Sequence, residues 1–176
     1  MMDFFDETSY KSLKDIEELS SDLKGVYAIC ATRESKLPDA VKKEVFNGGG
    51  FIIYANNSSN IKNELFNKCN GTDSGNFLKR LGALLDFKPP KGSLVGKTEI
   101  ENFEFSVEDK SKIREWIYDN LFFNYIVLEE DQMEAFKEHL VIQLSPVLNV
   151  QSNPFKSVLL NAKMDECFLY AKSEII

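Results

Sequence analysis

Two tyrosines are the side chains of this sequence that are best placed for chemistry. Tyr27 lies in an apolar run, residues 25–31, and Tyr54 follows 27 residues later at the end of residues 48–54. A phenol can position water or stabilise charge on a phosphate, and it can act as a general base when its pKa is lowered. Tyrosines on strands are also common packing residues, so that interpretation stays open.

Both tyrosines lie on segments that predict β-strands. Residues 25–31 are rich in strand-forming side chains, and residues 48–54 read as a second strand that is entered through three glycines. Residues 122–128 predict a third strand, and the loose alternation over residues 99–106 indicates a further one. The two tyrosines would therefore lie on neighbouring strands and share one cleft.

The remaining segments show apolar residues at helical spacing. They predict helices over residues 9–22, 60–69, 76–87, 107–120, 131–144 and 154–171. Because hairpin strands are mixed with helices rather than strictly alternating with them, the fold class is α+β.

The charge of the chain is acidic overall but uneven. Its 176 residues include 28 acidic and 21 basic side chains, a net charge of −7, which argues against binding nucleic acid through bulk charge. Residues 61–97 nevertheless carry +4, and residues 98–138 carry −8. DNA would be expected to bind through the first of these segments, at Lys62, Lys79 and Arg80, and a protein partner through the second. The lysines could equally form a solvated helix face.

The composition of the sequence disfavours several other classes of protein. Three widely spaced cysteines and a single histidine, His139, support neither a disulfide framework nor a zinc site. No apolar run approaches the roughly 20 residues of a membrane helix, and the N-terminus is acidic where a signal peptide would be basic. We expect a soluble cytoplasmic protein without contact with a membrane.

Several short segments together resemble the GIY-YIG nuclease superfamily. They occur in the family's order: Gly25-Val26-Tyr27, Tyr54-Ala55-Asn56, Asn60-Ile61-Lys62, residues 75–85, the Trp116 helix, and Pro146 to Asn149. The glycine of the second motif is replaced by Asn56. The resemblance covers about residues 25–153, and its helix over 75–85 is similar to that of a bacterial branch.

The resemblance implies a fold and an activity. It implies a small three-stranded sheet, antiparallel or mixed, flanked by helices within a GIY-YIG-like domain over residues 25–153. Residues 1–24 would be an N-terminal helical extension, and residues 154–176 a C-terminal helical extension packed on the same domain. Members of the family cut DNA phosphodiesters with one divalent metal, which stabilises charge on the displaced oxygens.

The family's catalytic residues can be carried over by position. Both motif tyrosines lie in its cleft, an arginine contacts phosphate, a histidine or tyrosine one turn later assists, and a glutamate on the last helix holds the metal. Here the arginine position is Glu64, the next is Lys68, and the glutamate position, counted back from Pro146, is Lys137. A carboxylate repels phosphate and an ammonium cannot ligate magnesium. We therefore expect lost nuclease chemistry and no cofactor.

Helical geometry supports this register for the last helix. Lys137 falls inside the apolar stripe of residues 133–144, whereas Glu138 falls outside it. The Lys137 ammonium could reach water at the edge of the stripe. Alternatively, Glu64, Lys68 and Lys137 form an ion-pair cluster that replaces the metal site, with Lys137 paired to Glu64.

A shift of one residue gives the opposite function. It would bring Glu138 to the metal position, with Arg80 or Lys62 as the phosphate contact. The chain would then be an active magnesium-dependent endonuclease that uses Tyr27, Tyr54 and a shifted glutamate, Glu138 or Glu134. The alternatives are thus a degenerate domain that binds or regulates DNA or a protein, an active endonuclease, and a structural domain of a larger complex.

Overall fold

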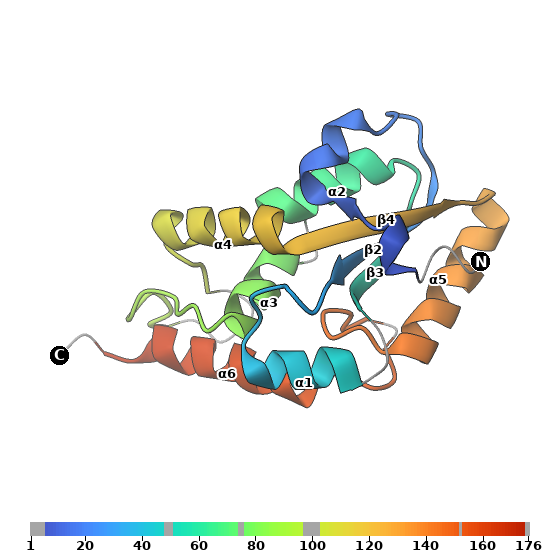
Figure 1. The fold of residues 1–176 in the computed structure, drawn as a ribbon. Helices are drawn as coiled ribbons and strands as arrows, with labels where there is room; N and C mark the ends of the chain where they lie inside the picture. The colour runs from blue at the N-terminus through green and yellow to red at the C-terminus, as the bar shows by residue number, and fades with distance from the viewer. Residues whose placement is uncertain (1–5, 48–50, 74–75, 97–102, 152, 175–176) are drawn as a thin grey trace.

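A computed structural model describes residues 6–47, 51–73, 76–96, 103–151 and 153–174. Its helices surround one sheet (Figure 1), which confirms the α+β class. The strands are β1 (Lys11–Ser12), β2 (Gly25–Ala31), β3 (Ile52–Ser58) and β4 (Leu121–Val127). The α-helices are α1 (Asp39–Asn47), α2 (Ile61–Asn70), α3 (Phe77–Leu84), α4 (Val107–Asn120), α5 (Glu130–Leu144) and α6 (Val158–Lys172).

The sheet is antiparallel and has the strand order β1-β4-β2-β3, so β3 is an edge strand. Its three long strands match the prediction, and the two-residue β1 adds a short fourth strand. Of the strand expected over residues 48–54, residues 48–50 lie outside the described residues, and β3 runs on to Ser58 because Asn56 and Asn57 pair with Tyr27 and Val26 of β2. Of the further strand expected over 99–106, residues 99–102 lie outside the described residues, and residues 103–106 are neither helix nor strand.

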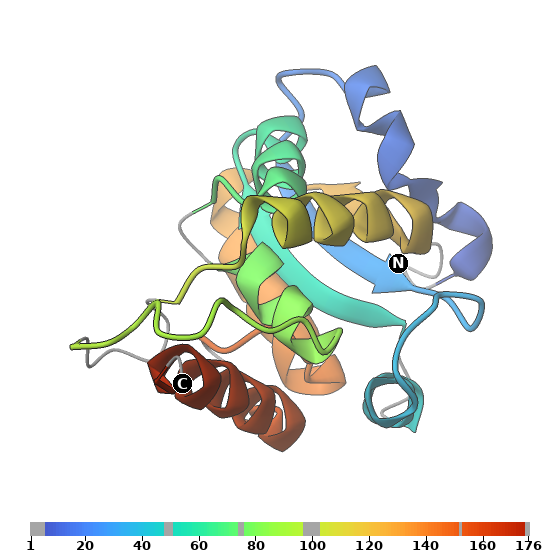
Figure 2. The ribbon, with the colours of Figure 1, turned by 90° about the vertical axis from the view of Figure 1, so that its left-hand side faces the viewer.

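The two faces of the sheet are covered by different helices. Figure 2 shows α5 on the far side of the sheet from α2, α3 and α4. Met133 and Leu140 of α5 pack with Val26 and Ala28 of β2. The other face carries Tyr27, whose core extends through α2, α3 and α4 to α6. Residues next to each other on a strand therefore face different helices.

The structure differs from the prediction in one predicted helix and in one helix that was not predicted. Residues 9–22 contain the 3-10 helix η3 (Leu13–Glu18) rather than an α-helix, preceded by β1 and the short η2 (Glu7–Ser9). Leu13, Ile16 and Leu19 recur every three residues, the period of a 3-10 helix, and all three are buried. Helix α1 lies in a polar segment for which no element was predicted.

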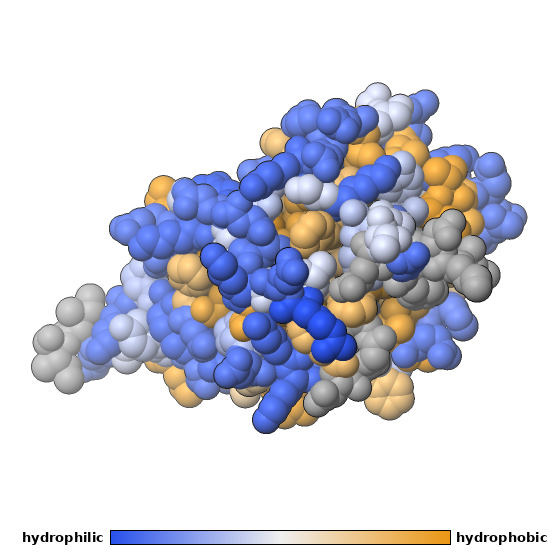
Figure 3. All heavy atoms as spheres, in the orientation of Figure 1, coloured by the Kyte–Doolittle hydropathy of each residue, from blue (hydrophilic) through white to orange (hydrophobic). Residues whose placement is uncertain are grey.

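One face of the molecule is largely polar. Figure 3 shows a mostly hydrophilic face on which hydrophobic atoms occupy small separate areas. In the part of the chain that the structure describes, no helix is long and apolar enough to cross a membrane. The three cysteines are buried and free.

One buried amide closes the free edge of β3. Asn149 accepts a hydrogen bond from the Ala55 N–H at 2.8 Å and donates one to the Ala55 carbonyl at 2.8 Å. The neighbouring Leu148 N–H donates to the Ile53 carbonyl at 2.9 Å. The segment after α5 thus satisfies the backbone of the edge strand and fixes the end of α5 beside it.

We predict that Asn149→Ala destabilises the fold. The substitution leaves both backbone groups of Ala55 buried without a partner, which costs about 2–4 kcal/mol in the free energy of unfolding. Asn161→Ala, at an exposed position of α6, is the matched control and should change stability by less than about 0.5 kcal/mol. Denaturant unfolding measures both variants. Equal stability of the two would contradict this role of Asn149.

Candidate functional site

Helix α2 carries two of the predicted site residues and is capped at both ends. The Asn60 side chain accepts a hydrogen bond from the Asn63 N–H at 2.9 Å, and Gly71 closes the other end with a φ of 70°. Glu64 and Lys68 lie one turn apart on the same face of this helix. The left-handed turn at Gly71 then brings the following loop back toward the last turn of α2.

The Lys68 ammonium is buried and surrounded by acidic and aromatic groups. Its side chain is 4% exposed, and its Nζ lies 3.2 Å from Asp73 Oδ2 and 3.9 Å from Glu64 Oε2. It also lies 4.7 Å from the centre of the Tyr54 ring. Burial alone lowers the pKa of Lys68, but the neighbouring Tyr54 and Asp73 outweigh it, and the pKa lies above its ordinary value. Lys68 is therefore charged at neutral pH.

The two motif tyrosines meet on the same face of the sheet. Tyr27 pairs with Asn56, Tyr54 pairs with Ile29, and the two ring centres are 6.3 Å apart. Tyr27 is fully buried, and its hydroxyl makes no hydrogen bond of ordinary length with a described residue. Burial raises its pKa well above the usual value, and the Asn56 side chain offsets only part of this effect. The phenol of Tyr27 therefore stays protonated at neutral pH.

Lys137 lies on the opposite face of the sheet, on α5. Its side chain is 14% exposed, in agreement with a position inside the apolar stripe, and it pairs with Glu134. Glu134 also accepts a hydrogen bond from the Asn57 side chain at 2.9 Å. The predicted pairing of Lys137 with Glu64 is thus wrong. The charges form two groups on either side of the edge strand, because Asn57 faces α5 while Asn56 faces α2.

The alternative metal ligand, Glu138, is exposed on α5. It lies outside the inward-facing stripe that holds Met133, Lys137 and Leu140. Among the described residues, no three histidine, cysteine, aspartate or glutamate side chains lie close enough together to hold a metal ion.

Several lysines of the basic segment are paired within the chain. Lys62 donates to the Glu17 carbonyl at 2.7 Å and lies 3.6 Å from its carboxylate. Lys79 pairs with Glu104 at 2.9 Å, and Lys88 pairs with Glu166 at 2.8 Å. Arg80 is half-buried on α3. Three of the lysines over residues 61–97 are therefore compensated by acids elsewhere in the chain.

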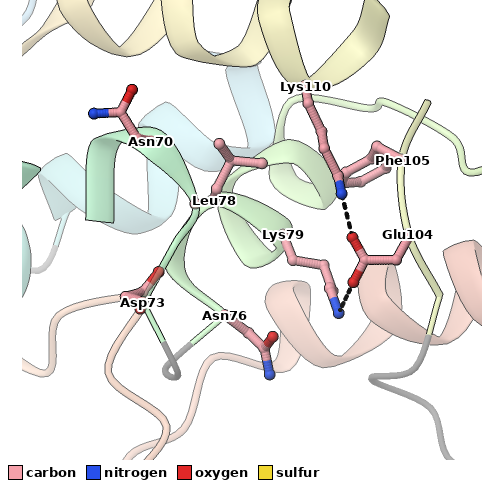
Figure 4. A pocket seen from close by; sticks show the side chains of 9 residues that line it. Asn70, Asp73, Asn76, Leu78, Lys79, Glu104, Phe105 and Lys110 are labelled. Atoms are coloured by element: carbon pink, nitrogen blue, oxygen red, sulfur yellow. Dashed lines mark ion pairs between the residues drawn. The ribbon is translucent and has the colours of Figure 1, made fainter. Parts of the chain in front are cut away.

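A pocket of about 150 Å³ lies beside the Lys68 ion pair. Figure 4 shows Lys79 and Lys110 converging on Glu104 at one side and Asp73 at the other. The distances from the Glu104 carboxylate are 2.9 Å to Lys79 Nζ and 2.5 Å to Lys110 Nζ. Two ammonium groups share one carboxylate at this pocket.

Two features that shape this region were not predicted from the sequence. They are the position of Asp73 and the hydrogen bonds of Asn149. The signal for Asp73 was present, because Asn70-Gly71 at the end of a helical pattern predicts a left-handed cap that turns the chain back. The role of Asn149 depends on a contact with β3 that sequence spacing does not reveal.

The family of the chain follows from this arrangement and from its sequence. The family model described as the GIY-YIG catalytic domain matches residues 25–165. This chain belongs to the GIY-YIG family. The match of this GIY-YIG chain begins at β2 and ends within α6. No curated protein and no solved structure matches it.

We predict that Lys68→Met strongly destabilises this GIY-YIG domain. The substitution leaves Asp73, whose side chain is 6% exposed, without its cation, which costs about 3–5 kcal/mol. Lys112→Met is the matched control, because Lys112 also pairs with a glutamate four residues earlier but is exposed. It should cost less than about 1 kcal/mol. Denaturant unfolding at neutral pH measures both variants.

The stability that Lys68→Met loses relative to the natural chain should also depend on pH. Since the folded-state pKa of Lys68 is raised, its contribution is complete below the ordinary lysine pKa of 10.5 and declines as pH rises through the folded-state pKa. An equal loss of stability in the two variants would contradict the buried ion pair.

Proposed function

We propose that this GIY-YIG chain has lost phosphodiester hydrolysis and works as a binding or regulatory module. The observation that carries the proposal is the reversal of charge at the positions of the family's catalytic residues. Glu64 replaces the phosphate-contacting arginine, and Lys137 replaces the metal-holding glutamate. Each lies in an ion pair, with Lys68 and with Glu134 respectively.

The chemistry of these groups supports the loss of catalysis. Glu64 and Asp73 place two carboxylates around one ammonium, so an approaching phosphodiester meets net negative charge. The residues at the metal position do not suit a divalent metal, because an ammonium offers no lone pair and Glu134 is bound to Lys137. Tyr27, protonated at neutral pH, is unsuited to act as a base.

The distribution of ion pairs favours a protein partner over DNA. Lys62, Lys79 and Lys88 are paired with acids elsewhere in the chain. Several acids of the segment 98–138 are instead exposed and make no ion pair with a described residue: Glu115, Glu130, Asp131 and Glu138. Three of them lie on α5, where a partner with a basic surface would find uncompensated negative charge.

A plasmid assay tests the proposal. Supercoiled DNA is incubated with the natural chain, Tyr27→Phe or Glu138→Ala in magnesium or manganese, and nicked and linear forms are measured on gels. We expect the three proteins to leave the plasmid equally intact. We also expect no retarded migration in gels that keep protein and DNA together, since lysine ion pairs compete with phosphate.

The variants separate true activity from contamination. A contaminating nuclease would cut equally in all three samples. Cleavage by the natural chain that both Tyr27→Phe and Glu138→Ala abolish would overturn the proposal and establish the shifted register.

A further inference from the structure

The surroundings of Lys68 resemble the way in which a protein holds a bound anion. The ammonium touches the face of one aromatic ring and receives a carboxylate at 3.2 Å, and both charged side chains are at least 94% buried. The carboxylate comes from Asp73, beyond the end of the helix that carries Lys68. Asp73 therefore fills the position that a ligand's oxyanion group would take.

A second buried polar group, the hydroxyl of Tyr27, lies on the same face of the sheet as Tyr54. The Tyr27 hydroxyl is fully buried and makes no hydrogen bond of ordinary length with a described residue. Tyr54, Glu64 and Asp73 are the acidic groups whose charges act on it. A buried hydroxyl that makes no hydrogen bond of ordinary length is costly, so an incoming acceptor would be favourable.

The pocket described above gives access to the same place. Asp73 lines this pocket, whereas Lys68 is not among its lining residues. The Asp73 side chain, labelled in Figure 4, thus borders the open volume and also contacts the Lys68 ammonium. Lys79 and Lys110, which share Glu104, bring positive charge to the outer part of the pocket.

We propose that Lys68 and Tyr27 form a binding site for a single phosphate or carboxylate group, and that Asp73 occupies this site in the free chain. This proposal rests on the proposed function in one respect. Both hold that DNA phosphate does not enter the site, here because the chain's own Asp73 carboxylate occupies it. A partner that presents an acidic group must displace Asp73. In the natural chain, the Asp73 carboxylate thus blocks the binding of other anions at Lys68.

Removal of the Asp73 charge should open the site. The experiment measures the melting temperature of Asp73→Asn against inorganic phosphate, with acetate as the carboxylate probe and chloride at equal ionic strength. Asp165→Asn, an exposed position on α6, corrects for the general stabilisation that phosphate gives to proteins. The double variant Lys68→Met with Asp73→Asn tests whether the ammonium is the receptor.

We expect a saturable rise in the melting temperature of Asp73→Asn. At a phosphate concentration tenfold above the apparent Kd, the rise beyond the Asp165→Asn control should be roughly 3–6 °C. The natural chain should show at least tenfold weaker binding, and the double variant none. A response to phosphate alone would assign the site to phosphate, and a response to both probes to oxyanions in general.

Several results would overturn the proposal. One is a phosphate-dependent rise in the melting temperature of Asp73→Asn that is no larger than the rise for Asp165→Asn. Another is a rise in the double variant that equals the rise in Asp73→Asn. Asp73→Ser is measured in parallel. If neither Asp73 variant folds at any phosphate concentration, the carboxylate is a fixed structural group and the proposal fails. None of these results depends on plasmid cleavage, so the proposed loss of nuclease chemistry stands or falls separately.

Discussion

The need to neutralise the buried Lys68 ammonium governs the arrangement of the candidate site. A charge that is 4% exposed is tolerated only when partners surround it, and here they are Asp73, Glu64 and the Tyr54 ring. Asp73 reaches it because Gly71 ends α2 in a left-handed turn. Burial raises the pKa of the Tyr27 phenol, and the nearby Tyr54, Glu64 and Asp73, which also surround Lys68, raise it further. The buried ammonium and the protonated motif tyrosine thus share the same three neighbours.

The edge strand β3 divides the region into two halves with different electrostatics. On one face, Lys68 holds two carboxylates beside the tyrosines. On the other, Lys137 holds Glu134, which also binds Asn57. Asn149 keeps the halves in register by bonding both backbone groups of Ala55. The chain thus keeps a helix-flanked antiparallel sheet of the GIY-YIG family, and we propose that the charges its chemistry requires are exchanged.

The sequence predicted the elements better than the contacts. Compact apolar runs identified β2 and β4, and helical spacing placed Lys137 inside the stripe of α5, because both patterns are local. The pairing of Lys137 with Glu64 failed since it required knowledge of which face of the sheet each helix covers. Helix α1 was missed because its segment is mostly polar, and η3 was taken for an α-helix because its three-residue repeat also fits one helical face.

The central claim is that an ammonium replaces the metal-holding carboxylate, so the most direct test is metal binding itself. Titration of Mn²⁺, followed by electron paramagnetic resonance, measures free and bound ion for the natural chain and for Glu138→Ala. The account predicts no saturable binding by either protein, with two superimposable titrations. Saturable binding of one equivalent by the natural chain, abolished in Glu138→Ala, would contradict it.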